Sequence, residues 1–380
     1  MSNDLKAARQ EIDKIDNELL QLFLKRMELG ERIGKYKQEN GLPIENPERE
    51  REILLHIWDS ADPEMRSYAC ILYSTLIDLN KAYQRRLNPQ GSRFIENIGN
   101  TLKNTEPVFP KTAKVACCGI PGAYAQIVTD KLFQLADLMY FNDFSAVFQA
   151  VENGLCRYGV LPIENSTAGT VDAVYDLMKD HHFCIVRSFR LPIRHSLLVN
   201  EGTKLEDVRE VISHEQALKQ CSRFLGNLNV KRTSCSSTAM AARIVSESGR
   251  KDVAAIASPN CAELYKLEIL NDTIQNSDFN YTRFICISKK PEIYPGANRI
   301  SIMATLPHKP GQLNRILSRF SVLSVNLTKL ESRPIPGHNF EYMFYFDFEA
   351  TVADPDVCKL LAELEQSGGK FFFLGNYAEY

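Results

Sequence analysis

The chain has 380 residues, of which 44% are hydrophobic and 24% are charged, and this is typical of a soluble globular protein of roughly two to four domains. Its 45 basic residues nearly balance its 47 acidic residues, which argues against nucleic-acid binding. No apolar run approaches the roughly 18 residues of a membrane span, and residues 1–6 begin an amphipathic helix where a signal peptide would carry an apolar core. We therefore expect a cytoplasmic protein.

Ten cysteines are scattered along the chain without C-x-x-C spacing. Cys117 and Cys118 are adjacent in an expected strand, so their side chains face opposite ways. We expect reduced thiols rather than disulfides. We expect neither a metal nor a cofactor, because no His, Cys and carboxylate grouping has ligand spacing and no glycine-rich nucleotide motif occurs.

Residues 3–39 are expected to form one long helix, because apolar side chains from Leu5 to Tyr36 recur at steps of three and four. Such a helix would be about 55 Å long, which is more than a small monomer covers. We therefore expect a homodimer or higher homo-oligomer in which helices of a second chain pack against it. A second helix is expected to start at Asn46 and Pro47, and a third to span residues 65–87.

Arg26 takes the place of an apolar residue in the seam of the first helix, where a buried charge needs a partner or a ligand. Lys37 lies three turns further along nearly the same face, whereas Arg9 does not share that face. On the third helix, Asn80 and Gln84 are four residues apart and can point into one site. Cations without a nucleophile or a metal cluster favour a reaction that needs only positioning and charge stabilisation. The alternative is that they are solvated charges of a charge-rich helix.

Residues 1–90 resemble the all-helical chorismate mutases in R-x-x-I-D-x-I-D from Arg9, L-L-Q-L-F-L-K-R-M-E-L through Arg26 and G-K-Y-K ending at Lys37. That family rearranges chorismate to prephenate in a pericyclic step without covalent catalysis. The resemblance implies that Arg26 and Arg9 of the partner subunit hold the substrate carboxylates. It also implies that Lys37 and Gln84 donate to the ether oxygen whose bond breaks.

The P-E-R-E run of the same family places Glu50 on the ring hydroxyl of the substrate, with Arg49 alongside. Asn46 and Asn80 stand where aspartate and serine are common in the family, and both remain candidates for substrate contact. Asn46 is equally suited to capping a helix. Because neither change removes the essential cations, the resemblance predicts an active mutase.

Residues 91–111 lose helical periodicity and carry several glycines and prolines, so we expect an ordered but irregular linker. Residues 112–290 then alternate short apolar strands with helices in two successive runs, and a last strand at 281–288 returns to the first run. This order predicts an α/β domain of two lobes with a ligand cleft between them.

The stretch 158–170 reads Y-G-V-L-P-I-E-N-S-T-A-G-T. A short apolar strand ends here in a carboxylate, an amide and two hydroxyls, just before a helical pattern, and free N–H groups at a helix start favour anions. His214, on another polar loop, is either a general base or a structural hydrogen-bonding group.

The blocks V-L-P-I-E-N-S-T-A-G-T, S-H-E-Q-A-L, S-S-T-A-M-A-A and N-Y-T-R-F resemble prephenate dehydratase over residues 112–290. That family's domain is two-lobed, as in periplasmic binding proteins, and its reaction removes carbon dioxide and the ring hydroxyl from prephenate. The resemblance makes Thr282 the proton donor to the leaving hydroxyl and Arg283 a carboxylate or scaffold contact. Ala125 departs from a serine common in relatives. The residues implied to shape the site are Glu164, Asn165, Ser166, Thr167 and Ser213.

Residues 291–296 form a proline-containing joint, and residues 297–380 have the βαββαβ order of a ferredoxin-like α+β fold. Two blocks, L-P-H-K-P-G at 306–311 and N-L-T-K-L-E-S-R-P at 326–334, resemble the amino-acid-binding regulatory family ACT. The resemblance implies phenylalanine as an effector bound between protomers, although Pro310-Gly311 alone is also a common turn. The implied effector contacts are Pro310, Gly311, Gln312, Leu313, Asn326, Glu331, Ser332 and Arg333.

Together these resemblances predict a bifunctional chorismate mutase and prephenate dehydratase, inhibited by phenylalanine and free of metals and cofactors. Two alternatives remain. One is a dehydratase whose helical segment only dimerises, and the other is a non-catalytic amino-acid sensor.

Overall fold

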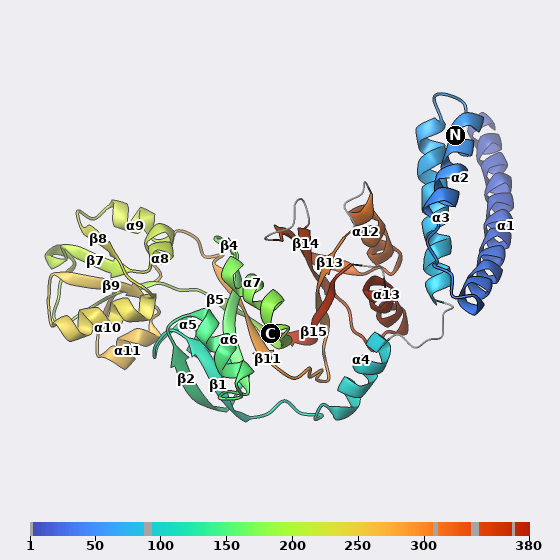
Figure 1. Ribbon diagram of the computed structural model, residues 1–380. Coiled ribbons are helices and arrows are strands. Elements are labelled where there is room, and N and C mark those ends of the chain that lie inside the picture. Colours follow the sequence, from blue (N-terminus) through green and yellow to red (C-terminus); the bar gives the residue numbers. More distant parts are fainter. Residues whose placement is uncertain (1–2, 87–92, 307–310, 336–341, 367–368) are drawn as a thin grey trace. The chain divides into compact units, whose positions relative to one another are not determined.

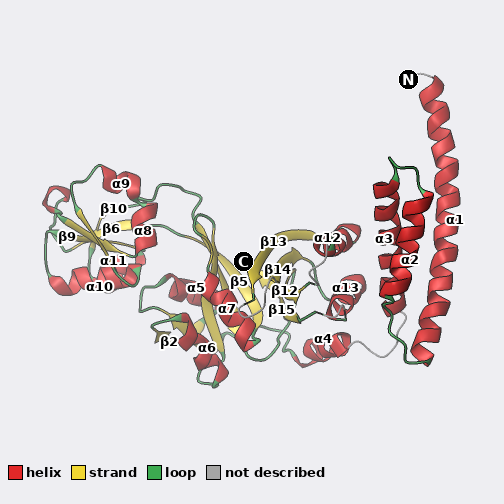
Figure 2. Ribbon diagram, turned by 45° about the horizontal axis from the view of Figure 1, so that its top comes forward, coloured by secondary structure: helices red, strands yellow, loops and turns green. Residues whose placement is uncertain are grey.

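The computed structural model describes residues 3–86, 93–306, 311–335, 342–366 and 369–380. They fall into two compact units. The first consists of Met1–Ile98 and Pro355–Gly369, and the second of Gly99–Asp354 and Lys370–Tyr380. Figures 1 and 2 show that, among the described residues, the first unit is helical and the second holds the strands.

The helices of the first unit follow the predicted order. Asn46 caps the second of them, since its side-chain oxygen accepts a hydrogen bond from the Arg49 amide at 3.1 Å, and the helix-cap interpretation is confirmed. The helices are α1 (Asn3–Glu39), α2 (Pro47–Ser60), α3 (Arg66–Arg86) and α13 (Pro355–Glu365).

Two glycines of α1 allow α3 to approach closely. A Cβ atom on Gly30 would lie 1.9 Å from the amide nitrogen of Asn80, and one on Gly34 would lie 3.0 Å from Cγ of Gln84. The four-residue spacing of the glycines matches that of the two polar residues. The polar side chains of α3 therefore lie directly on the backbone of α1.

The irregular linker predicted over residues 91–111 is only partly correct, because it contains helix α4 (Arg93–Asn104). Phe94 and Ile98, four residues apart, are both buried, which is the spacing of an amphipathic helix. The prolines that suggested irregular structure lie outside the helix, at positions 89 and 107–110.

The first lobe of the second unit is a sheet in which β2, β1 and β3 run parallel and β11 returns antiparallel to β3. The sequence did not predict β5, which pairs with β11 on its other side. Strands are β1 (Thr112–Cys118), β2 (Leu135–Phe141), β3 (Tyr158–Asn165), β4 (Gly169–Thr170), β5 (Cys184–Pro192) and β11 (Tyr281–Ser288), and helices are α5 (Tyr124–Leu132), α6 (Phe144–Glu152) and α7 (Asp172–His181).

The second lobe has its own sheet, in the order β10-β6-β9-β7-β8. The chain enters this lobe after β5 and leaves it before β11, so two crossing segments join the lobes, as the sequence predicts. Strands are β6 (Ser196–Val199), β7 (Glu210–Ser213), β8 (Lys231–Ser234), β9 (Val253–Ala257) and β10 (Glu268–Asn271), and helices are η1 (Leu205–Asp207), α8 (Glu215–Gln220), α9 (Ser222–Gly226), α10 (Thr238–Ser248) and α11 (Asn260–Tyr265).

The C-terminal segment has the predicted βαββαβ order, and its strands follow the order β13-β14-β12-β15. The elements not yet named are β12 (Arg299–Thr305), α12 (Gln312–Val322), β13 (Asn326–Pro334), β14 (Tyr342–Glu349) and β15 (Phe371–Glu379).

The end of β15 pairs in parallel with β5, which joins the C-terminal strands and the first lobe in one sheet. Gly375 makes this close approach possible, because a Cβ there would lie 2.2 Å from the carbonyl oxygen of Ile185. Within the described ranges, no helix combines the length and apolarity needed to cross a membrane.

Candidate functional site

The polar side chains of α1 and α3 gather around Arg26. Its guanidinium donates to the Leu76 carbonyl at 2.9 Å, and Asn80 donates to the Arg26 carbonyl at 3.4 Å. Burial, partly offset by Tyr73, lowers the pKa of Arg26. Among the described residues no carboxylate pairs with it. A half-buried cation bound only to a carbonyl is suited to an anionic ligand.

Gln84 completes this polar group, as the spacing of Asn80 and Gln84 predicts. Its amide nitrogen donates to the Asn80 side chain at 2.6 Å, which uses one of the two amide hydrogens. Its Oε1 is buried without a hydrogen-bond partner. Gln84 therefore has a donor and an acceptor left for a bound molecule.

The other predicted mutase cations are more exposed. Lys37 donates to the carbonyl of Ile44 at 2.6 Å, and Arg49 pairs with Glu52 at 2.8 Å. Arg9 lies on an exposed part of α1. The single chain thus brings together Arg26, Asn80 and Gln84.

Glu50 forms an ion pair that the sequence did not predict. Its carboxylate lies 2.8 Å from Nζ of Lys81 on α3, and Lys81 also lies 3.3 Å from Asp78. The sequence could have placed Lys81 near this site, because Lys81 lies three residues before Gln84 and hence on an adjoining part of the helix surface.

A second polar group lies where β3 and β11 end beside one another. Asn165 and Thr282 are paired across the two strands, and the Asn165 amide donates to Oγ1 of Thr282 at 2.9 Å. Thr282 is 8% exposed. Because its oxygen accepts this bond, the hydroxyl hydrogen is left for another acceptor.

A cavity of about 250 Å³ opens next to this pair. Thr167 borders it from the first lobe and helix α8 from the second, so it lies between the lobes as predicted. Lys219 is the only charged residue of its lining. The lining residues are Thr167, Gln216, Lys219, Gln220, Gln275, Asn276, Ser277 and Asn280.

Gln220 links the two lobes across the cavity and was missed by sequence reasoning. Its amide nitrogen donates to the Thr167 hydroxyl at 2.7 Å, and its carbonyl lies 3.0 Å from Nε2 of His195. His195 Nδ1 lies 3.2 Å from the Tyr124 hydroxyl. Burial lowers the pKa of His195, although the Gln220 bond opposes this. Tyr124, Thr167, His195 and Gln220 lie far apart in the sequence, so their spacing did not indicate this hydrogen-bond network.

Asn280 also belongs to the cavity. Its carbonyl accepts from the Asn165 amide at 2.9 Å, while its own amide nitrogen is buried without a hydrogen-bond partner. An unpartnered buried donor is costly unless a ligand or water satisfies it. Asn280 is therefore a further candidate for substrate contact.

Two serines expected in the site have other partners. The Ser166 hydroxyl donates to the Phe279 carbonyl at 3.0 Å and accepts from the Tyr281 amide at 2.9 Å, which fixes the segment before β11. Ser213, predicted to shape the substrate site, has a structural partner. Its hydroxyl is fully buried and donates to the Ile256 carbonyl at 2.6 Å, joining β7 to β9.

Glu164 and Arg283 do not face the cavity with their neighbours Asn165 and Thr282. Adjacent residues of a strand point to opposite faces, and here Arg283 pairs with the buried Asp347 of β14 while Glu164 lies 3.2 Å from Lys329 of β13. The scaffold role of Arg283 is thus favoured over contact with a substrate carboxylate.

His214 caps helix α8. Its Nδ1 accepts a hydrogen bond from the Gln216 amide at 3.3 Å, which favours the structural interpretation of this histidine over the general base.

The predicted effector residues lie on α12 and β13, apart from Pro310, which is outside the described residues. Gly311 caps the helix with φ of 81°, and Gln312 and Leu313 form its first turn. Asn326 donates to Glu349 at 2.8 Å. Because β12 and β13 both run antiparallel to β14, the start of α12 and the end of β13 lie at the same edge of the sheet.

Alternate residues of β13 face the first lobe. Glu331 accepts from the Thr170 hydroxyl at 2.5 Å, and Arg333 pairs with Asp172 and, at 3.2 Å, with Asp176 of α7. Ser332 is exposed on the other face. Glu331 and Arg333 are therefore held by the dehydratase segment in addition to any effector.

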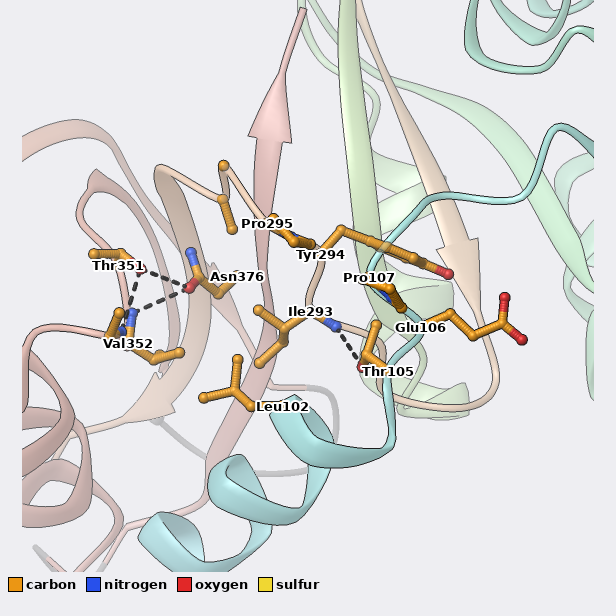
Figure 3. A pocket seen from close by; sticks show the side chains of 13 residues that line it. Leu102, Thr105, Glu106, Pro107, Ile293, Tyr294, Pro295, Thr351, Val352 and Asn376 are labelled. Atoms are coloured by element: carbon orange, nitrogen blue, oxygen red, sulfur yellow. Dashed lines mark hydrogen bonds between the residues drawn. The ribbon is translucent and has the colours of Figure 1, made fainter.

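Another cavity, of about 300 Å³, lies where the end of α4 and the segment after it meet the loop after β14, Asn376 of β15 and the joint at 293–297 (Figure 3). Thr105 and Asn376 in its lining are bonded to backbone groups of the protein. The Ile293 amide donates to Thr105 at 3.1 Å, and the Val352 amide donates to Asn376 at 3.0 Å. This cavity has the character of a packing gap. In the parts of the chain that the structure describes, no group of His, Cys, Asp and Glu could hold a metal ion.

Comparisons with known proteins match two segments of the chain to families. A family model of chorismate mutase type II matches residues 8–85, and one of prephenate dehydratase matches residues 115–292. Arogenate dehydratase/prephenate dehydratase 1, chloroplastic, of Arabidopsis thaliana is 41% identical over 281 residues, which cover 70% of this chain and 71% of that protein. Arogenate dehydratase 2 of Petunia hybrida is 33% identical over 353 residues, covering 87% and 89%.

A solved structure of prephenate dehydratase from Arthrobacter aurescens in complex with L-Phe has 29% sequence identity and a TM-score of 0.64. The match covers 70% of this chain and 89% of that one. The chain therefore belongs to the prephenate dehydratase family and carries a chorismate mutase type II segment ahead of the dehydratase segment.

Proposed function

We propose that the chain is a bifunctional enzyme of phenylalanine biosynthesis. It rearranges chorismate to prephenate and then converts prephenate to phenylpyruvate. The observation that carries the second activity is the Thr282 hydroxyl, which accepts a hydrogen bond from the Asn165 amide, and Asn165 also donates to Asn280 in the lining of the cavity between the lobes. We assign mutase to residues 1–90, a linker to 91–111, dehydratase to 112–290 and regulation to 297–380.

In the dehydratase reaction, Thr282 donates its proton to the leaving hydroxide of prephenate. The electron pair of the carboxylate carbon–carbon bond moves into the ring as carbon dioxide departs, and the ring becomes aromatic. Water then restores the proton of Thr282. The protein's task is to hold two carboxylates and supply one proton, for which a positioned donor and preorganised polar groups suffice.

We expect the cavity to favour prephenate over arogenate. Arogenate carries an ammonium group where prephenate has a ketone, and a buried ammonium needs an acidic partner. The eight residues that line the cavity include no carboxylate, and Lys219, the charged residue among them, is paired with Glu215 at 2.7 Å. We expect kcat/KM for prephenate to exceed that for arogenate by at least about tenfold, since each 1.4 kcal/mol of discrimination is a factor of ten. A preference for arogenate in competition assays would reverse this assignment.

In the mutase reaction, Arg26 binds a substrate carboxylate and Gln84 donates its second amide hydrogen to the ether oxygen. Lys37 and Glu50 complete the site, with Arg9 supplied by the partner subunit. The support is the half-buried charge of Arg26 and the second amide hydrogen of Gln84, since the bond to Asn80 uses only one of the two. Such groups act by holding the chair-like transition state and its developing charge.

Phenylalanine is the proposed feedback inhibitor, bound by an ACT domain over residues 297–380. Support comes from the βαββαβ order, from the common edge of α12 and β13, and from the relative of known structure that holds L-Phe. That match covers 70% of this chain and therefore extends beyond residues 115–292, the segment that the dehydratase family model matches.

The decisive experiment follows chorismate and then phenylpyruvate by ultraviolet absorbance. In Thr282→Ala, we expect chorismate consumption to be unchanged and phenylpyruvate formation to fall by at least about tenfold, as is usual for loss of a positioned proton donor. Thr282→Ser keeps the hydroxyl and should retain most of the activity. Equal phenylpyruvate rates in Thr282→Ala and the parent would remove Thr282 from the mechanism.

A further inference from the structure

Two neighbouring cross-strand pairs of β3 and β11 face opposite sides of the sheet. Asn165 pairs with Thr282 and Glu164 with Arg283. The first pair is joined by a hydrogen bond, and Asn165 also donates to Asn280 in the lining of the cavity between the lobes. The second pair meets β13 and β14 of the C-terminal segment. The proton donor is therefore covalently next to a residue that the C-terminal segment holds.

Arg283 is anchored on that side by several carboxylates. It is 6% exposed, pairs with Asp347, and lies 3.6 Å from Glu164 and 3.9 Å from Glu379. Burial alone would lower the pKa of Arg283, but Asp347, Tyr377 and Tyr175 together outweigh burial and the pKa is raised well above its ordinary value. The guanidinium is thus a permanent charge whose position follows Asp347.

Asp347 is in turn held by its own segment. Its second oxygen accepts from the Ser301 hydroxyl at 2.5 Å, and Ser301 lies 2.6 Å from the Tyr377 hydroxyl. These residues come from β14, β12 and β15. A shift of the C-terminal strands therefore moves the carboxylate to which Arg283 is bound.

A second connection runs alongside the first. Nζ of Lys329 lies 3.2 Å from Glu164 and 3.3 Å from Glu331, and it donates to the Thr170 hydroxyl at 3.0 Å. Glu331 lies within the proposed effector block. The chain of contacts from that block therefore ends at Glu164, beside Asn165.

We propose that Asp347 is a positioning residue for the dehydratase reaction. Asp347 fixes Arg283, and through Arg283 it fixes the part of β11 that carries Thr282. Binding of an effector to the C-terminal segment can therefore change the position of the proton donor. This inference rests on the proposed dehydratase function and on phenylalanine as effector. In a poorly hydrated site a charge pair resists separation more than the same pair in water. A small movement of Asp347 is therefore expected to move Arg283 with it.

The test compares Asp347→Asn with Glu349→Gln in the full chain. Glu349 lies two residues further along β14 and also carries an ion pair, with Arg299 at 3.3 Å, but its side chain is 49% exposed and is not among the carboxylates around Arg283. The measurements are kcat and KM for prephenate, inhibition by phenylalanine, phenylalanine binding by calorimetry, and mutase activity as a check on integrity.

For Asp347→Asn we expect kcat to fall at least about fivefold with KM within about twofold, because the proton donor is displaced while the substrate contacts remain. Phenylalanine should still bind. The concentration that halves activity should rise by at least about fivefold, the lower end of common coupling between sites. Glu349→Gln should match the parent in kcat and KM for prephenate, and it is the control for these two quantities only, because Glu349 also accepts from Asn326 of the proposed effector block.

A kcat in Asp347→Asn equal to that of Glu349→Gln, together with inhibition by phenylalanine equal to that of the parent, would overturn the proposal, and so would a rise in KM without a change in kcat. Ser301→Ala provides a milder variant that keeps both charges and should shift the same quantities in the same direction. A normal Ser301→Ala protein, together with a misfolded Asp347→Asn protein, would also count against it.

Failure of the underlying function is separate. A parent protein that forms no phenylpyruvate would refute the dehydratase. One that forms phenylpyruvate but neither binds nor responds to phenylalanine would refute the effector, while the effect of Asp347→Asn on kcat would still decide the positioning role.

Discussion

At the scale of single residues, His195 makes the junction of the lobes sensitive to pH. Its pKa is lowered from the ordinary value of 6.5 by burial, so at acidic pH the unfolded chain binds a proton that the folded chain does not. The stabilisation is present above pH 6.5 and is lost as pH falls from there through the lowered pKa of the folded state. The limiting slope is about 1.4 kcal/mol per pH unit for one proton.

We therefore predict that the amides of β6, next to His195, lose protection from hydrogen exchange between pH 7 and pH 5, after correction for intrinsic rates. His195→Gln retains a neutral hydrogen-bonding group and should show a flatter pH dependence. The same dependence in the variant and the parent would assign the effect to other groups.

Single residues also show which features of the site were predictable. Asn165 and Thr282 lie in two distinctive blocks, and their meeting follows once the blocks are placed on adjacent strands. Because neighbouring residues of a strand alternate, the sequence also contained the information that Glu164 and Arg283 must face away. Gln220 and His195 could not be predicted, because their partners depend on how two lobes close over one another.

At the scale of elements, the α1 and α3 pair depends on Gly30. We predict that Gly30→Ala displaces the Asn80 side chain and lowers mutase kcat/KM by at least about tenfold, since displacements of about 1 Å cost rates of this order. Dehydratase activity of the same preparation should be unchanged.

Gly99→Ala is the matched control. Gly99 also lies inside a helix, and nothing lies within 4 Å of an added Cβ. This substitution should leave both activities unchanged and stabilise α4 by about 0.5–1 kcal/mol. Equal mutase rates in Gly30→Ala and Gly99→Ala would show that the Asn80 contact is dispensable.

The elements that sequence reasoning missed have physical reasons. β5 reads C-I-V-R-S-F-R-L-P, and its two arginines suggest a solvated segment. In the structure the guanidinium of Arg187 lies 3.8 Å from the centroid of the Phe109 ring, so tertiary packing shelters a charge that the local pattern places in water. The strands of 112–141 and 299–349 were predictable because their apolar runs are short and bounded by clear breakers.

At the scale of the whole molecule, the two proposed activities differ in what they require. The dehydratase cavity is lined by one chain, whereas the proposed mutase site takes Arg9 from the partner subunit. Large apolar side chains along α1, such as Ile12 at 55% and Leu22 at 63% exposed, are what a second copy would cover.

We predict that specific mutase activity falls on dilution toward the dissociation constant of the dimer, while dehydratase activity per chain stays constant. Leu22→Asp should move the loss of mutase activity to concentrations at least about tenfold higher, because it places a charge in the contact. Mutase activity independent of concentration in Leu22→Asp would mean that one chain completes the site.

The pairing of β15 with β5 also bears on how such enzymes can be recombined. The C-terminal segment is joined to the sheet of the dehydratase segment because β15 pairs with β5 through backbone hydrogen bonds and Gly375 packs closely against Ile185. A C-terminal segment grafted from a relative would need a matching strand register and a glycine at this position. It would also need carboxylates placed to pair with Arg283. Chimeras that join segments of two different parents at residue 296 should therefore fold poorly. In functional chimeras we expect the dehydratase and C-terminal segments to come from the same parent.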